Sequence, residues 1–318
     1  MSEESVRTYS ILGERVSCNI DLALVAPYSG GHATLHVEVV DEGEEGAEWA
    51  PQRSAGCQTD DRGFFVDFDD VCDARIDFAG REILCRRFGD GSAYELQHRI
   101  ANAIVPYFVV GLGDLVIHAS AVELDGYAVA FVGDSGRGKS TLASCLSDNG
   151  WSPVSDDACR IIFRADTPYL ISHFGGFRLL DNTHLVSEER PSVAGRAKSV
   201  RRAGNGTLSD MPIPIAAIFV IETESEEVGI QALDLTSAFT ELMAGSFALD
   251  TRDRKHVERR FEQVGRLVET RLLCDLRFPR RMSVYPELSR AIIKHISRHE
   301  AAPNPSGTIL PAQGETDS

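Results

Sequence analysis

Positive charge is scarce in this chain. Its 318 residues include 32 Lys and Arg against 48 Asp and Glu, which gives a formal net charge of −16 at pH 7. A surface of this sign repels a polyanion on average. The composition therefore argues against a protein that binds nucleic acid through general phosphate contacts, although a local basic patch is compatible with it.

Long hydrophobic runs and paired cysteines are also missing. The longest apolar stretch, residues 101–115, falls short of the roughly 20 residues that span a bilayer, and Pro106 interrupts it. The first ten residues have neither the basic region nor the apolar core of a secretory signal. The seven cysteines are scattered without a CxxC pair, as is typical of reduced thiols. We expect a cytoplasmic protein with no membrane partner and no disulfide framework.

The residues that are present divide the chain into three parts. Residues 1–92 alternate apolar and polar positions at 34–39, 64–68 and 74–78, which predicts a β-rich region. Residues 93–300 contain strand patterns at 115–122, 127–132, 152–155, 160–164, 213–221, 228–235 and 272–276. Helical patterns lie between them at 93–110, 139–148, 236–248, 252–271 and 285–298. Residues 301–318 are rich in Pro, Gly, Ser and Thr, and we expect disorder there. The predicted fold class is α/β with a mixed sheet.

A glycine-rich loop follows the apolar strand predicted at 127–132. Glycines let backbone N–H groups approach phosphate oxygens, and a following helix directs the positive end of its dipole at the same anion. Lys139 would neutralise the β and γ phosphates, and the Ser140 hydroxyl would ligate Mg²⁺. The strand, loop and helix together predict an ATP site rather than a merely flexible loop. Its residues fit G-x-x-x-x-G-K-[ST] at every position and are Gly133, Asp134, Ser135, Gly136, Arg137, Gly138, Lys139, Ser140 and then Thr141.

Two carboxylates and a histidine are the other candidates for chemistry. Asp156 and Asp157 follow the strand predicted at 152–155, and ligands of open α/β sheets bind at the carboxyl ends of strands. Adjacent carboxylates are costly there unless a cation or a proton neutralises them. Taken alone, the pair could be a turn or a helix cap, and His118 a core residue. With a phosphate loop in the same domain, a catalytic role for the pair is favoured.

Together these motifs resemble the kinase domain of the HPr kinase/phosphorylase family. They read His118-Ala119-Ser120-Ala121-Val122, then the loop at 133–140, then Val154-Ser155-Asp156-Asp157. From His118 to Ser140 there are 22 positions (140 − 118), and from Ser140 to Asp156 there are 16 (156 − 140). The resemblance implies a kinase core related to the carboxykinases. It also implies that Asp156 is a general base, that Asp157 holds Mg²⁺ with Ser140, and that His118 hydrogen-bonds Asp156 and tunes it.

Two departures separate the chain from bifunctional members of that family. Thr141 stands where the family commonly has a glutamate, and residues 173–178 lack the glutamate of the family's later signature. The chain is more similar to a divergent branch found in biosynthetic clusters, which includes kinases that phosphorylate a serine of lasso precursor peptides. In that branch a β-rich N-terminal region precedes the kinase core, and a basic segment and a Pro-rich apolar strand follow. Here these last two would be residues 198–202 and 212–219. The basic segment either closes over the nucleotide or acceptor, or is a solvated loop.

The predicted function is ATP-dependent transfer of the γ-phosphoryl group to a hydroxyl, with Asp156, His118 and Lys139 as catalytic residues. The acceptor would be a serine of a peptide or protein, or a small alcohol. Thr141 leaves room for an alternative, a nucleotide-binding regulatory or assembly protein with little turnover. A carboxykinase-like enzyme ranks third, because it needs more metal ligands than the sequence offers. The resemblance also suggests a homo-oligomer.

Overall fold

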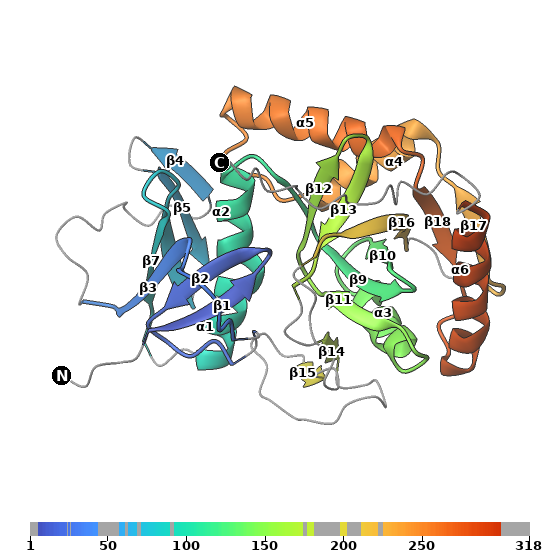
Figure 1. Cartoon of the computed structure of the whole chain (residues 1–318), viewed down its shortest axis with the longest axis horizontal. Helices are drawn as coiled ribbons and strands as arrows, with labels where there is room; N and C mark the ends of the chain where they lie inside the picture. Colours follow the sequence, from blue (N-terminus) through green and yellow to red (C-terminus); the bar gives the residue numbers. More distant parts are fainter. Residues whose placement is uncertain are drawn as a thin grey trace, which may run out of the picture.

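The computed structural model describes residues 6–23, 25, 27–43, 57–60, 63–68, 71–89, 92–173, 177–180, 198–201, 211–221 and 225–299. In these residues the chain is a mixed α/β protein. A seven-stranded sheet from the N-terminal region and a nine-stranded sheet lie on either side of a helical segment (Figure 1). The predicted α/β class is confirmed at this level. The tail predicted at 301–318 lies outside the described residues.

The first sheet has the strand order β1-β2-β3-β7-β6-β5-β4. In β3, Leu35, Val37 and Val39 are buried, whereas His36 and Glu38 between them are exposed, so the alternation that predicted this strand is confirmed. The sequence patterns did not reveal β1, β2, β4 or β7. The strands are β1 (Arg7–Ile11), β2 (Glu14–Cys18), β3 (Leu35–Asp41), β4 (Cys57–Asp60), β5 (Gly63–Phe68), β6 (Cys72–Asp77) and β7 (Glu82–Arg87).

The helical segment consists of α1 (Ala93–Arg99), a π-helical turn η1 (Ile100–Ile104) and α2 (Val105–Gly111). Pro106 is the second residue of α2, just beyond the π-helical turn, and its missing N–H removes a regular helical hydrogen bond. The segment buries Leu96, Ile100, Ile104 and Phe108, spaced four apart, in one core with residues of the first sheet. Residues 93–111, which the sequence grouped with the second region, therefore pack as part of the first.

The second sheet has the order β11-β9-β10-β16-β13-β12-β8, and β18 extends it by pairing with β16 and β17. The prediction of one strand over 115–122 is wrong, because the extended segment is divided into two strands at His118. There β8 pairs with β12, whereas β9 pairs with β10 and β11. The strands are β8 (Leu115–Ile117), β9 (Ala119–Leu124), β10 (Tyr127–Val132), β11 (Ser152–Ser155), β12 (Cys159–Arg164), β13 (Thr167–Ile171), β16 (Ile213–Val220), β17 (Gly229–Ala232) and β18 (Leu273–Arg277).

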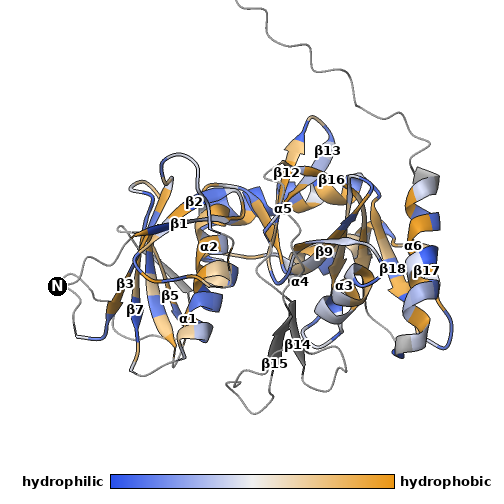
Figure 2. Ribbon diagram, turned by 60° about the horizontal axis from the view of Figure 1, so that its bottom comes forward, coloured by the Kyte–Doolittle hydropathy of each residue, from blue (hydrophilic) through white to orange (hydrophobic). Residues whose placement is uncertain are grey.

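Helices cover both faces of the second sheet. Helices α3 (Lys139–Ser147) and α6 (Tyr285–His299) share a core with Phe131 and Phe219 on one face. Helices α4 (Leu235–Gly245) and α5 (Arg254–Glu269) share a core with Ile218 and Val220 on the other. Because β16 is buried on both faces, its sequence is a continuous apolar run, as predicted. Figure 2 shows β16 largely in the hydrophobic colour, and α6 carrying both hydrophobic and hydrophilic residues.

A short turn and a pair of strands lie outside the two large sheets. A short 3-10 turn, η2 (Met282–Val284), precedes α6. Strands β14 (Phe177–Leu180) and β15 (Lys198–Arg201) pair in a separate two-stranded sheet, so four of the five residues of the basic segment at 198–202 form a strand. Within the part of the chain that the structure describes, no helix is both long enough and apolar enough to cross a membrane.

Candidate functional site: a glycine-rich loop and an acidic turn

Four strands of the second sheet end at the same edge. Strand β16 runs parallel to both β10 and β18. Strand β11 is antiparallel to β9, which is itself antiparallel to β10, so β11 also runs in the direction of β10. The loop after β10 and the turn after β11 therefore lie at one edge, where α/β sheets bind their ligands.

The loop after β10 depends on its glycines. Gly133, Gly136 and Gly138 have φ values of 140°, 84° and 90°, which L side chains rarely adopt. A Cβ at Gly133 would also lie 2.8 Å from the carbonyl oxygen of Ile221, at the end of β16. By contrast, a Cβ at Gly136 or Gly138 would meet no atom within 4 Å, so the loop borders open space there. The loop backbone therefore depends on glycine at all three positions and leaves open space beside two of them.

Lys139 is the first residue of α3 and crosses the loop. The residue is only 6% exposed, and its Nζ donates hydrogen bonds to the carbonyl oxygens of Gly133 at 2.7 Å and Asp134 at 3.2 Å. Helix α3 is held under the sheet by Leu142, Ala143 and Leu146, all of which are fully buried. An ammonium group and the positive end of a helix dipole therefore meet at the loop.

Asp156 begins the turn after β11 and is 5% exposed. Its Oδ1 accepts a hydrogen bond of 2.6 Å from the Ser120 hydroxyl on β9. Ser120 pairs with Phe131 of β10, and directly opposed residues share a face of the sheet. Because the ring of Phe131 packs in the core beneath α3, Ser120 and its partner carboxylate lie on the α3 side. Only β9 separates β11 from β10, so the strands that lead into the turn and the loop are about 9–10 Å apart.

Asp157 has a φ of 68°, a left-handed conformation that residues other than glycine seldom adopt. His118 Nδ1 lies 2.7 Å from the Asp157 carbonyl oxygen, and since a carbonyl only accepts, the ring nitrogen donates. His98 Nε2, from α1, lies 3.0 Å from Asp157 Oδ2. Contacts from His118, between β8 and β9, and from His98 on α1 therefore hold the turn in its unusual conformation.

The structure brings most of the predicted site residues to one edge, with one difference in their contacts. His118 was expected to hydrogen-bond the carboxylate of Asp156, but its hydrogen bond goes to the backbone carbonyl of Asp157. The Asp156 carboxylate is instead bonded by Ser120. Ser120 belongs to the segment 118–122 that carries the family resemblance, but the sequence assigned it no function. His98 lay in no motif, and no sequence signal could have linked it to the acidic turn.

His173 is a third histidine beside this turn. It pairs with Ser155 in an isolated parallel bridge and is 3% exposed. Burial lowers the pKa of His173 from its ordinary value of 6.5 to about 4, and the neighbouring His98 acts in the same direction. A hydrogen bond with the backbone of Ser10 in β1 partly opposes this shift. Residues 174–176, which follow it in the segment 173–178 compared with the family's later signature, lie outside the described part of the chain.

This pKa predicts acid sensitivity. Between pH 6.5 and about 4 the unfolded chain binds a proton on this histidine that the folded chain does not, so stability falls as the pH drops through that window. Above pH 6.5 the residue adds no pH dependence. The loss should reach about 3.5 kcal/mol below pH 4, at about 1.4 kcal/mol per pKa unit. The variant His173→Gln keeps an N–H donor for Ser10 and does not titrate, so its stability should fall less on acidification.

Urea unfolding at pH 7 and pH 4.5 measures the effect as a difference between variants, because carboxylates also titrate in this range. His32→Gln, at an exposed position, is the matched control and should follow the unaltered chain. Equal acid sensitivity of the His173→Gln and His32→Gln variants would show that His173 is not the responsible group.

Comparisons with known proteins add a weak likeness. No family model matches the chain, and no curated protein does. The solved structure of the HPr(Ser) kinase/phosphatase from Coxiella burnetii matches with a TM-score of 0.31 and 10% sequence identity. That match covers 58% of this chain and 98% of the other. A likeness of this size assigns no function, so the following proposal rests on the site itself.

Proposed function

We propose that this protein is an ATP-dependent kinase that transfers the γ-phosphoryl group to a hydroxyl of a peptide, a protein or a small alcohol. One observation carries the proposal. The loop with Lys139 and the buried carboxylate of Asp156 lie at the same sheet edge, on the side of α3, after two strands, β10 and β11, that are about 9–10 Å apart by strand spacing. That separation accommodates phosphates between a cationic cradle and a group that accepts a proton.

The nucleotide end of the site would hold ATP through the loop. Backbone N–H groups at the start of α3 and the Lys139 ammonium would bind the phosphate oxygens, and the lysine would exchange its loop carbonyls for them. Ser140 and Asp157 would hold Mg²⁺, which neutralises developing charge on the phosphates. In the described residues no group of three or more His, Cys, Asp or Glu side chains could hold a metal by itself. Mg²⁺ usually takes one or two protein ligands and completes its shell with phosphates and water, so Ser140 and Asp157 would be enough to hold it.

The acceptor end of the site would be Asp156. The hydrogen bond from Ser120 fixes the orientation of its carboxylate. In the reaction the acceptor O–H bond breaks, its oxygen forms the new bond to the γ-phosphorus, the proton passes to Asp156, and ADP leaves. His118 would keep the turn in place through the Asp157 carbonyl. Such a site acts by positioning and charge neutralisation, which phosphoryl transfer chiefly requires.

A nucleotide-binding regulator with little turnover is the second candidate, because Thr141 stands where the resembled family commonly has a glutamate. Incubation of the full chain with Mg-ATP separates the two. We would measure ADP release alone and with serine-containing peptides, proteins and small alcohols, and detect phosphorylated products by mass spectrometry. A kinase forms ADP and a phosphorylated acceptor in equal amounts. Tight nucleotide binding with no acceptor-dependent ADP would instead support the regulator.

A further inference from the structure

The acidic turn receives a side chain from outside its own sheet. His98 lies on α1, which packs with the N-terminal sheet: its neighbour Leu96 is buried in the same core as strand residues Phe64 and Ile83. His98 itself is 8% exposed and stacks on Tyr94, with ring centroids 6.5 Å apart. The ring is therefore fixed by the N-terminal part of the chain.

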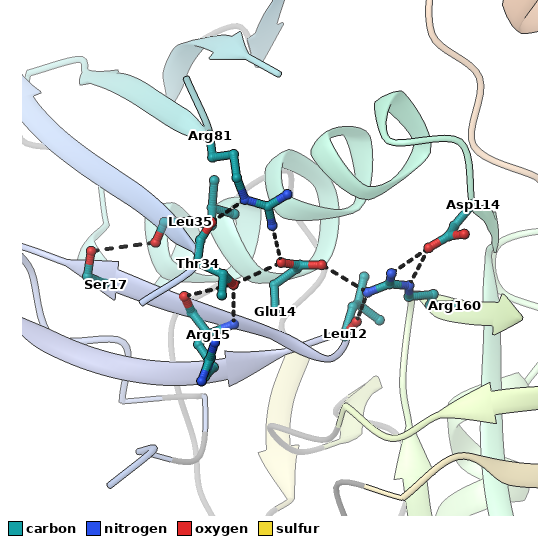
Figure 3. A network of polar contacts seen from close by, with 9 residues as sticks. All are labelled: Leu12, Glu14, Arg15, Ser17, Thr34, Leu35, Arg81, Asp114 and Arg160. Atoms are coloured by element: carbon teal, nitrogen blue, oxygen red, sulfur yellow. Dashed lines mark hydrogen bonds and ion pairs between the residues drawn. The ribbon is translucent and has the colours of Figure 1, made fainter. Parts of the chain in front are cut away.

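The N-terminal sheet is anchored close to the turn. Arg160 of β12, three residues after Asp157, donates to the Leu12 carbonyl at 2.7 Å and pairs with Glu14 at 3.2 Å and Asp114 at 2.5 Å (Figure 3). Glu14 is held in turn by Arg81 and Thr34 (Figure 3). The side chain of Arg160 is 15% exposed, so water screens these contacts only partly.

Apolar packing continues the same contact. Ala158, the residue after the acidic pair, is fully buried in the core of the N-terminal sheet, together with Val116 from β8. His173, beside the turn, is hydrogen-bonded to the backbone of Ser10 in β1. The position of His98 relative to Asp157 is thus set by apolar packing, by an ion-pair network and by backbone contacts.

We propose that His98 is a positioning residue of the catalytic centre, which the N-terminal part of the chain completes. This inference rests on the proposed function. The two carboxylates of the acidic pair have different partners: Asp156 is bonded by Ser120 beneath α3, whereas Asp157 is bonded by His98 from α1. Through the 3.0 Å contact at Oδ2, His98 orients the carboxylate that would hold Mg²⁺. A hydrogen-bond partner of this kind fixes a metal-binding side chain, and its loss typically weakens metal affinity about 10- to 100-fold.

The test compares His98→Leu with His98→Gln, whose side-chain amide keeps an N–H donor near the position of Nε2. Mn²⁺ replaces Mg²⁺ as the probe, and its affinity for the full chain with a non-hydrolysable ATP analogue is measured by electron paramagnetic resonance. His98→Leu should weaken Mn²⁺ binding about tenfold or more, and His98→Gln should restore most of it. The control is His36→Leu, which alters an exposed histidine of β3 in the N-terminal sheet that is bonded to Ser17, and it should bind Mn²⁺ as the unaltered chain does.

Activity and stability complete the test. Phosphoryl transfer by His98→Leu should need a higher Mg²⁺ concentration for half-saturation, and circular dichroism reports whether each variant is folded. Unchanged Mn²⁺ affinity and Mg²⁺ dependence in a folded His98→Leu variant would overturn the inference and leave the kinase proposal intact. Weakened Mn²⁺ binding in a chain that phosphorylates no acceptor would support the role of His98 and reject the kinase.

Discussion

Asp156→Asn is expected to bind ATP as the unaltered chain does and to lose about 10²- to 10⁴-fold in the rate of phosphoryl transfer, the range that a general base contributes. Asparagine has the same shape as aspartate and retains an oxygen that can accept the Ser120 hydrogen bond. It cannot take the proton of an acceptor hydroxyl. The substitution therefore removes the proposed chemistry while leaving the turn in place.

Single-turnover transfer and binding of a non-hydrolysable ATP analogue measure the two quantities separately. Asp125→Asn is the matched control: it removes the same charge from an exposed turn between β9 and β10, where asparagine tolerates the positive φ of 53°. That variant should transfer phosphate normally. If the Asp156→Asn variant also transfers at the unaltered rate, Asp156 is not the base.

Ser120→Ala tests how far orientation matters at the same carboxylate. The variant keeps the charge of Asp156 but removes its 2.6 Å hydrogen bond. Its transfer rate should fall between those of the unaltered chain and Asp156→Asn, with nucleotide binding unchanged. A rate below that of Asp156→Asn would instead indicate that Ser120 itself takes part in the proton transfer.

The glycine-rich loop could be predicted from sequence because its demands are local. A backbone with φ near 90° at Gly136 and Gly138 accepts few residues other than glycine, so the glycines of the motif themselves predict this conformation. The same holds for β16, whose unbroken apolar run follows from burial on two faces. In both cases the structure depends on residues that are close together in the sequence, so a local sequence pattern is enough to predict it.

The rest of the site depends on how two sheets pack together, which no local pattern encodes. His98 and Asp157 are 59 positions apart, and Arg160 meets Glu14 across 146 positions. The interruption at His118 is also a long-range effect, but within the second sheet: β8 and β9 are one continuous strand pattern in the sequence, and they pair with different neighbours. The helix at 93–111 also has an apolar face that could cover either sheet, and only packing assigns it to the first.

Lys139→Ala is expected to weaken ATP binding strongly. A hydrogen bond to a charged group is worth about 1.5–3 kcal/mol, so the loss of the ammonium should raise the Kd for ATP roughly 10- to 150-fold. Isothermal titration calorimetry with a non-hydrolysable analogue measures this directly. Lys255→Ala, which removes the same charge from an exposed position on α5, should leave the affinity unchanged.

Because Lys139 is 6% exposed and bonds the carbonyls of Gly133 and Asp134, its loss could also loosen the loop itself. Lys139→Met separates these effects, since methionine fills a similar volume without the charge. A phosphate-binding lysine requires both variants to lose affinity to a similar extent. If the Lys139→Met variant binds ATP as the unaltered chain does, the lysine holds the loop together and the phosphates are bound by backbone N–H groups alone.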